Sequence, residues 1–151
     1  MEKYKVLIVD DIPDNINTVT EMIKDFDLDV KTANGGKEAI ELVETFKPNI
    51  ILLDLMMPAV NGWDVIDYVR SKYSKTDMAI IVVSLLSNKD NIDECYELGV
   101  NDYVIKPILK ARLVSSLDAH LKNIARNANS LDNAPTNDNN SEDSAKMVHL
   151  G

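Results

Sequence analysis

The sequence predicts an α/β protein in which a parallel sheet carries helices on both of its faces. The first observation is that residues 5–9, 50–53 and 79–83 are short, almost uninterrupted apolar runs, typical of strands covered on both sides. The second is that these runs alternate with segments whose apolar residues recur at helical spacing. Because parallel neighbours need a crossover between them, the alternation predicts a doubly wound (βα)5 sheet with right-handed connections.

Ten elements are expected along the chain. In order they are strand 5–9, a helix from about 14, strand 28–32, helix 37–46, strand 50–53, a helix from about 63, strand 79–83, helix 89–98, strand 103–105 and a helix from about 109. The strand 28–32 alternates in polarity, so we expect it at an edge of the sheet. The strand 50–53 has four large apolar residues in succession, so we expect it in the middle.

Each helix is predicted from apolar residues three or four positions apart. The inward stripes are Ile16, Val19, Ile23 and Phe26; Ile40, Val43 and Phe46; Ile66, Val69 and Tyr73; Ile92, Cys95 and Tyr96; and Leu113, Leu117, Leu121 and Ile124. Asp14 is expected as an N-cap or first-turn acid, and Gly99 as a C-terminal stop. Pro48 separates the second helix from the central strand.

Length and composition place the chain among globular proteins with one domain. We expect that domain at 1–126 and a disordered tail or linker stub at 127–151, where Asn, Asp, Ser and Ala replace large apolar residues. The net charge of −9 argues against direct binding of nucleic acid, which requires basic residues. No apolar stretch is long enough to span a bilayer, and no signal peptide is visible, so the expected location is cytoplasmic with no membrane partner.

Polar residues stand directly after the buried strands. These residues are Asp10, Asp11, Asp54, Ser84 and Lys106. Because the carboxyl ends of parallel strands share one edge of the sheet, we expect the five side chains to converge there. Three carboxylates repel one another unless a cation intervenes, and oxygen ligands in an open site suit Mg2+. A carboxylate in such a site can also attack phosphorus and form an aspartyl phosphate.

These residues resemble the receiver domain of two-component response regulators, particularly single-domain receivers of the chemotaxis-regulator kind. The resemblance covers about residues 3–124. The motifs that carry it are Val9-Asp10-Asp11, Leu52-Leu53-Asp54 with Pro58 and Gly62 downstream, Ser84, and Tyr103-Val104-Ile105-Lys106-Pro107. It implies a flavodoxin-like sheet in the strand order 2-1-3-4-5.

The resemblance also implies a role for each site residue. Asp54 is the expected phospho-acceptor, and Asp11, Asp54 and the backbone carbonyl of Met56 are expected Mg2+ ligands, with Asp10 acting through water. Lys106 and Ser84 are expected to contact the phosphoryl oxygens. Tyr103 is the expected aromatic switch, and the Lys106–Pro107 bond is expected to be cis.

The implied function is a phosphorylation-activated signalling switch in a phosphorelay, not an enzyme with an external substrate. A histidine kinase or phosphotransfer protein would supply the phosphoryl group, and a small acyl phosphate could also do so. Phosphorylation would alter the face made by the fourth helix, the last strand and the fifth helix. That face would meet a downstream partner protein or form a homodimer.

The sequence departs from the family pattern beside the expected phosphorylation site. Leu85 stands where the family usually has a small residue, and the flanking positions Met56 and Leu86 are also apolar. We hypothesise that these three side chains shield an aspartyl phosphate from water and slow its hydrolysis.

Two other functions use similar residues or topology. A Mg2+-dependent phosphatase acting through an aspartyl phosphate is the main alternative, but it needs a second acid at the position of Met56. A flavin-binding module of similar topology needs hydroxyl-rich residues after the first strand, where this chain has Asp10, Asp11 and Asp14.

Overall fold

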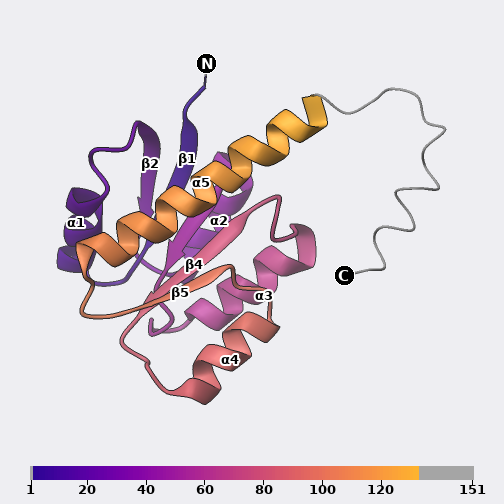
Figure 1. Ribbon diagram of the computed structural model, residues 1–151. Helices are drawn as coiled ribbons and strands as arrows, with labels where there is room; N and C mark the ends of the chain where they lie inside the picture. The colour runs from indigo at the N-terminus through magenta and orange to yellow at the C-terminus, as the bar shows by residue number, and fades with distance from the viewer. Residues whose placement is uncertain (1, 133–151) are drawn as a thin grey trace.

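The computed structural model describes residues 2–132 as one five-stranded parallel sheet with five helices (Figure 1). The elements are β1 (Tyr4–Val9), α1 (Pro13–Met22), β2 (Leu28–Ala33), α2 (Gly36–Phe46), β3 (Ile50–Leu53), α3 (Gly62–Lys72), β4 (Ala79–Ser84), α4 (Lys89–Glu97), β5 (Asp102–Ile105) and α5 (Lys110–Asp132). The strand order is β2-β1-β3-β4-β5, which confirms the flavodoxin-like prediction.

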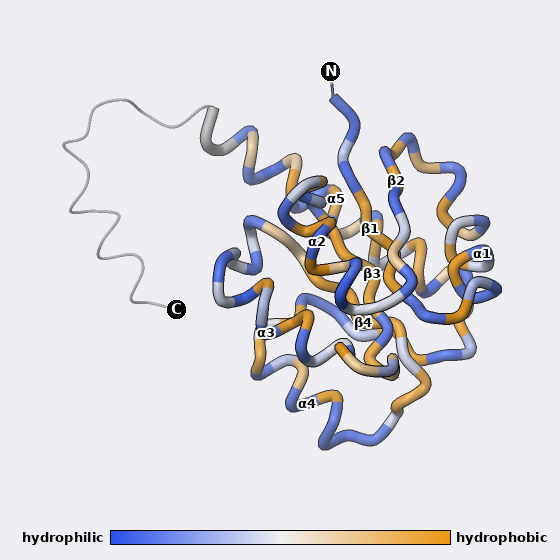
Figure 2. Tube along the Cα trace, turned by 180° about the vertical axis from the view of Figure 1, so that it is seen from behind, coloured by the Kyte–Doolittle hydropathy of each residue, from blue (hydrophilic) through white to orange (hydrophobic). Residues whose placement is uncertain are grey.

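Successive side chains of each strand point to opposite faces, so the buried runs divide into two cores. On one face the strand residues Leu7, Ile51 and Ile80 pack with residues of α2, α3 and α4. On the other face Ile8, Leu52 and others pack with residues of α1 and α5. Figure 2 shows the interior strands as mainly hydrophobic and α4 as largely hydrophilic.

The central position of β3 follows from its sequence. All four of its residues are buried, and it pairs with β1 on one side and β4 on the other. The edge strand β2 alternates between half-buried and exposed residues from Leu28 to Lys31, and it ends on the exposed Thr32 and the buried Ala33. The carboxyl end of β3 is therefore held between two neighbours, and the residue that follows it has little freedom.

Helix α1 begins one residue earlier than its sequence suggests. Its N-cap is Ile12, Pro13 occupies the first helical turn, and Asp14 is an exposed first-turn acid. Proline suits this position because its missing N–H would have no partner inside the helix. Of the two roles considered for Asp14, the structure therefore shows the second.

Helix α5 is longer than its composition suggests. It continues through 127–132, which the composition predicts to be part of the tail. The remainder of the predicted tail, 133–151, lies outside the described residues. Between residues 2 and 132, no helix combines the length and apolarity needed to cross a membrane.

Candidate functional site

The register of the central strands brings two of the predicted site residues together. Val9 of β1 pairs with Leu53 of β3, so Asp10 and Asp54 each follow one member of a pair. The backbone N–H of Asp54 continues the ladder by donating to the carbonyl of Val9 at 3.0 Å. Both aspartates thus occupy equivalent positions at the carboxyl edge of the sheet.

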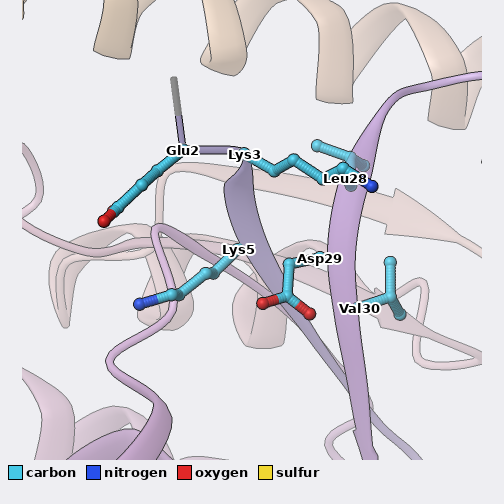
Figure 3. A pocket seen from close by; sticks show the side chains of 6 residues that line it. All are labelled: Glu2, Lys3, Lys5, Leu28, Asp29 and Val30. Atoms are coloured by element: carbon cyan, nitrogen blue, oxygen red, sulfur yellow. The ribbon is translucent and has the colours of Figure 1, made fainter.

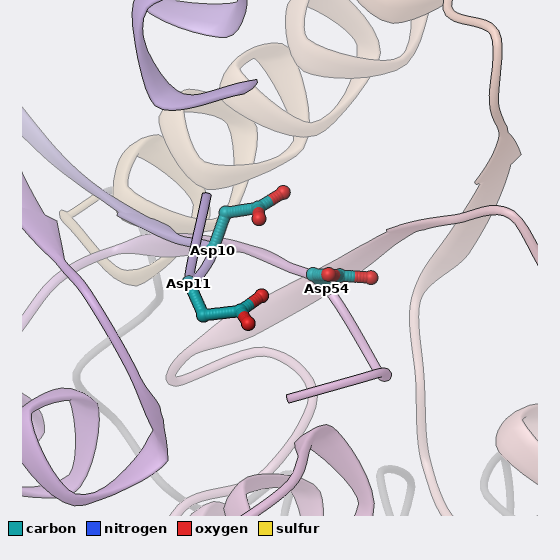
Figure 4. Close-up of side chains that lie close together, drawn as sticks. All are labelled: Asp10, Asp11 and Asp54. Atoms are coloured by element: carbon teal, nitrogen blue, oxygen red, sulfur yellow. The ribbon is translucent and has the colours of Figure 1, made fainter. Parts of the chain in front are cut away.

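The three predicted acidic residues form a compact cluster at this edge (Figure 4). One carboxylate oxygen from each of Asp10, Asp11 and Asp54 lies within 4.8 Å of the other two. Asp10 and Asp54 are buried, with only 5% of each residue exposed. Charges of one sign this close together and this poorly hydrated need a cation.

Lys106 supplies part of that positive charge. Its Nζ lies 2.9 Å from Oδ2 of Asp10 and 3.9 Å from Oδ2 of Asp54, and its side chain is only 11% exposed. It reaches the cluster because the β4–β5 ladder continues past Ser84, whose carbonyl accepts from the backbone N–H of Lys106 at 2.8 Å. The sheet thus brings together residues 96 positions apart.

Two donors that the sequence analysis did not identify hold Asp10 in place. The backbone N–H of Ile12 donates to Oδ1 of Asp10 at 3.0 Å, and Nδ2 of Asn15 donates to the same oxygen at 3.3 Å. Asn15 lies in the first turn and a half of α1. Asn15 is only five residues after Asp10, but its amide reaches the carboxylate only once the chain has turned from β1 into α1.

The donor set fits a hard divalent cation. Asp11 offers the clearest sign, because its Oδ1 is buried and has no hydrogen-bond partner among residues 2–132. A buried carboxylate oxygen without a donor is costly, and a bound cation would remove that cost. Three carboxylates with no nitrogen or sulfur ligand suit a hard, oxygen-binding ion such as Mg2+ better than thiolate- or imidazole-preferring metals.

The surroundings of Asp54 disfavour its charge when no cation is bound. Burial raises the pKa of its carboxyl above the ordinary value, Lys106 opposes this shift, and Asp10 adds to it. The backbone N–H of Met56 lies 3.4 Å from Oδ1 of Asp54 and is a weak additional donor. A cation in the cluster would offset these costs and favour the ionised form of the carboxyl.

Ser84 lies at the same edge and Tyr103 lies further back along β5, but both are bonded to Leu86 in this structure. Ser84 is fully buried, and its Oγ accepts from the N–H of Leu86 at 3.2 Å. The hydroxyl of Tyr103 donates to the carbonyl of Leu86 at 2.7 Å, and the ring is buried. The two residues are thus linked through the first turn after β4. The Lys106–Pro107 bond is cis, as predicted.

The apolar residues next to Asp54 do not all have the same surroundings. Met56 and Leu85 are 55% and 70% exposed, and both line a cavity of about 570 Å3 that reaches Asp54 and Lys106. Leu86 instead packs against the core formed with α2, α3 and α4. The shielding hypothesis can therefore apply to Met56 and Leu85, whereas Leu86 belongs to the link between Ser84 and Tyr103.

A second cavity lies at the opposite edge of the sheet, near the amino ends of β1 and β2 (Figure 3). Its lining residues are Glu2, Lys3, Lys5, Leu28, Asp29 and Val30. Acidic and basic side chains are mixed there, and Lys3 forms an ion pair with Asp27. The cavity lies away from the acidic cluster and has no concentration of one charge.

A doubly wound sheet whose carboxyl edge gathers three aspartates and a lysine defines a receiver module. The chain belongs to the response regulator receiver domain family, whose model matches residues 6–118. Members of this family are typically signalling switches, and they interact with histidine kinases.

Named relatives share the receiver region. The chain is 33% identical over 123 residues to a protein of Vibrio cholerae described as a probable cyclic di-GMP phosphodiesterase, covering 82% of this chain and 28% of that protein. It is 31% identical over 122 residues to the DNA-binding response regulator MtrA of Mycolicibacterium smegmatis, covering 80% of this chain and 51% of MtrA. The chain thus spans about a quarter to a half of the length of these relatives.

A solved structure supports the same assignment. The receiver domain of Francisella response regulator 1452 superposes with a TM-score of 0.72 at 27% identity, covering 79% of this chain and 97% of that one. The predicted family is therefore confirmed by sequence and by fold.

Proposed function

We propose that this chain is a phospho-accepting switch of a phosphorelay, with Asp54 as the acceptor. The observation that carries the proposal is the position of Asp54. It shares a compact cluster with Asp10 and Asp11, and Lys106 reaches both Asp10 and Asp54. Asp54 also follows the central strand, so its carboxylate is held in one place by the sheet.

In this proposal an oxygen of Asp54 attacks the phosphorus atom of a phosphohistidine on a histidine kinase or phosphotransfer protein. The new O–P bond forms as the P–N bond breaks, and the imidazole leaves with the electron pair. Mg2+, held by Asp11, Asp54 and the Met56 carbonyl with Asp10 acting through water, would neutralise charge on the phosphoryl oxygens. Lys106 and the hydroxyl of Ser84 would bind those oxygens as well.

The proposed switch uses the link through Leu86. If Ser84 turns its hydroxyl toward a phosphoryl group, it gives up its bond with the N–H of Leu86, and the carbonyl that holds Tyr103 is free to move. This change would alter the face made by α4, β5 and α5, which we propose as the surface for a downstream protein or for a homodimer. We propose a cytoplasmic location, as is usual for receiver domains.

The phosphatase alternative has less support. Two residues after Asp54 stands Met56, whose thioether cannot protonate a leaving group. Carboxylates do lie nearby, but Lys106 holds Asp10, and Asp11 has the uncompensated oxygen expected of a metal ligand. Each of the three acidic residues thus has another role, and none is left to protonate the leaving group of a phosphatase substrate.

Mass spectrometry after incubation with acetyl phosphate and MgCl2 tests the proposal. The wild type should gain one phosphoryl group, and Asp54→Asn should gain none. Asp67→Asn is a matched control, since Asp67 is exposed on α3. An adduct on Asp54→Asn equal to that on the wild type would place the acceptor elsewhere. Sustained turnover of a phosphomonoester would favour the phosphatase instead.

A further inference from the structure

A groove leads away from Asp54 between helix α1 and the segment that follows β5. Its volume of about 570 Å3 lies in the range of small-ligand pockets, about 300–1,000 Å3. Its apolar walls include Ile12 and Met22 on one side, Ile108 on the other, and Met56 and Leu85 at the end next to Asp54. The groove is therefore continuous with the proposed site of phosphoryl transfer.

The groove follows one face of α1. Ile12, Asn15, Thr18 and Met22 line it and are three or four positions apart, which places them along one side of the helix. Ten residues of helix span roughly 15 Å. The groove thus extends from the acidic cluster toward the C-terminal end of α1.

The charged side chains that line the groove lie at the end next to the acidic cluster. Among residues 2–132, the ionisable residues that line it are Asp54 and Lys106. Its two other polar side chains already have partners, since Asn15 donates to Asp10 and the hydroxyl of Thr18 donates to the carbonyl of Asp14. A complementary molecule therefore has an anionic phosphoryl head beside Lys106 and an uncharged apolar tail.

Resting on the phosphoryl transfer proposed above, we propose that this groove binds a small phosphodonor, an acyl phosphate whose aliphatic chain is longer than that of acetyl phosphate. An oxygen of Asp54 forms the new O–P bond, and the bond between phosphorus and the acyl oxygen breaks. The carboxylate leaves with the electron pair, while its chain stays against Met22 and Ile108. The apolar wall thereby selects the donor through its leaving group.

A series of acyl phosphates tests the proposal. Rates of Asp54 phosphorylation are measured by mass spectrometry with acetyl, butyryl and hexanoyl phosphate in MgCl2, each corrected for its own hydrolysis. Complete burial of one methylene group corresponds to roughly a fourfold gain in binding. Partial burial of four should therefore raise kcat/KM at least about tenfold from acetyl to hexanoyl phosphate. Equal rates across the series would overturn the proposal and assign the groove to a segment of a protein donor.

Two variants show whether the groove causes the preference. Met22→Lys places a charge at the apolar end and should reduce the ratio of the hexanoyl to the acetyl rate to near one. Asn17→Lys adds the same charge to an exposed position of α1 outside the groove and should keep the wild-type ratio. A ratio that stays high in Met22→Lys would also overturn the proposal.

A non-transferable ligand separates this proposal from that of phosphoryl transfer. Hexylphosphonate has a C–P bond that cannot be transferred, and calorimetric titration in MgCl2 should show it binding at least about tenfold more tightly than methylphosphonate. If acetyl phosphate gives no adduct on Asp54, the proposed function fails, yet this titration still tests the groove. Equal affinities of the two phosphonates would overturn the groove proposal alone.

Discussion

Lys106 and the three aspartates illustrate how single residues set the charge balance of the site. Three carboxylates and one ammonium leave two negative charges if all are ionised, and the ammonium lies closer to Asp10 than to Asp54. Asp54 is thus the less compensated of the two buried acids, consistent with the raised pKa of its carboxyl. The site gives up stability that a cation can restore.

Replacing Asp54, the proposed phospho-acceptor, should therefore stabilise the protein when no metal is present. Asp54→Asn removes a buried charge and should raise the free energy of unfolding by roughly 0.5–2 kcal/mol in EDTA. Urea denaturation measures this free energy. Asp67→Asn is the control, because it removes a charge at an exposed position. Added MgCl2 should stabilise the wild type more than Asp54→Asn. A variant less stable than the wild type in EDTA would contradict this account of the cluster.

Leu85 should influence how long an aspartyl phosphate survives. Its side chain lines the cavity that reaches Asp54, so Leu85→Ala should admit water and speed dephosphorylation several-fold. The decay of the phosphorylated protein, followed by mass spectrometry after removal of the donor, measures this. Leu109→Ala is the matched control, since Leu109 is equally exposed. No change in decay for Leu85→Ala would sink the shielding hypothesis.

At the scale of elements, two polar side chains join helices to the sheet. The guanidinium of Arg70 in α3 donates only to uncharged oxygens. These are the carbonyls of Tyr73, Ser74, Met78 and Gly99 and Oδ1 of Asn101. It thereby ties the end of α3 to the start of β4 and to the turn that follows α4. Asp102 performs a similar task at β5, where Arg112 and Ser116 of α5 donate to it.

Arg70→Lys should destabilise the protein despite keeping the charge. An ammonium has three donors and no planar fork, so at least two of the five acceptor oxygens would lose this donor. We expect a loss of roughly 2–3 kcal/mol in urea denaturation. Hydrogen exchange should rise most in α4, whose only fully buried residue is Cys95. Arg126→Lys, on the exposed part of α5, should have little effect.

Asp102 should make stability depend on pH in the acid range. Burial acts to raise the pKa of its carboxyl, but hydrogen bonds from Arg112, Ser116 and the Tyr103 amide lower it to about 2. A folded pKa below the unfolded value, about 3.9, gives stability that is present above pH 4 and lost as the pH falls toward 2. We expect this contribution to be roughly 1–2 kcal/mol, since Arg112 is partly exposed.

The comparison of Asp102→Asn with the wild type checks that expectation. The two curves of unfolding free energy against pH should differ most at neutral pH and approach each other between pH 4 and 2. Asp29→Asn, at an exposed position of β2, should keep the wild-type slope. Parallel curves for Asp102→Asn and the wild type would show that protonation of Asp102 does not affect the free energy of unfolding.

At the scale of the whole molecule, the parallel sheet explains what the sequence could predict. Once strands 5–9 and 50–53 are recognised as buried neighbours, Asp10, Asp11 and Asp54 must emerge at one edge, and Lys106 follows by the same rule. The bond from Asn15 to Asp10 was not predictable, because it depends on how α1 rotates against the sheet. The same holds for the bonds that Leu86 makes to Ser84 and Tyr103.

The C-terminal boundary shows a limit of composition as a guide. Asn-rich sequence from residue 127 has poor helix propensity, yet α5 continues to Asp132. Packed residues such as Leu113 and Leu117 already nucleate this helix. Extending a helix costs much less free energy than nucleating one. The packed residues of α5 therefore carry the helix past the point where the composition changes.

The length of α5 has a mechanical consequence. Its 23 residues form a rod of roughly 35 Å, which starts next to Lys106 and Pro107 and runs back toward the opposite edge of the sheet (Figure 1). A tilt of only about 5° at its first turn would displace its last turn by roughly 3 Å. If phosphorylation tilts the helix at the acidic edge, its far end would therefore move several times as far as its first turn.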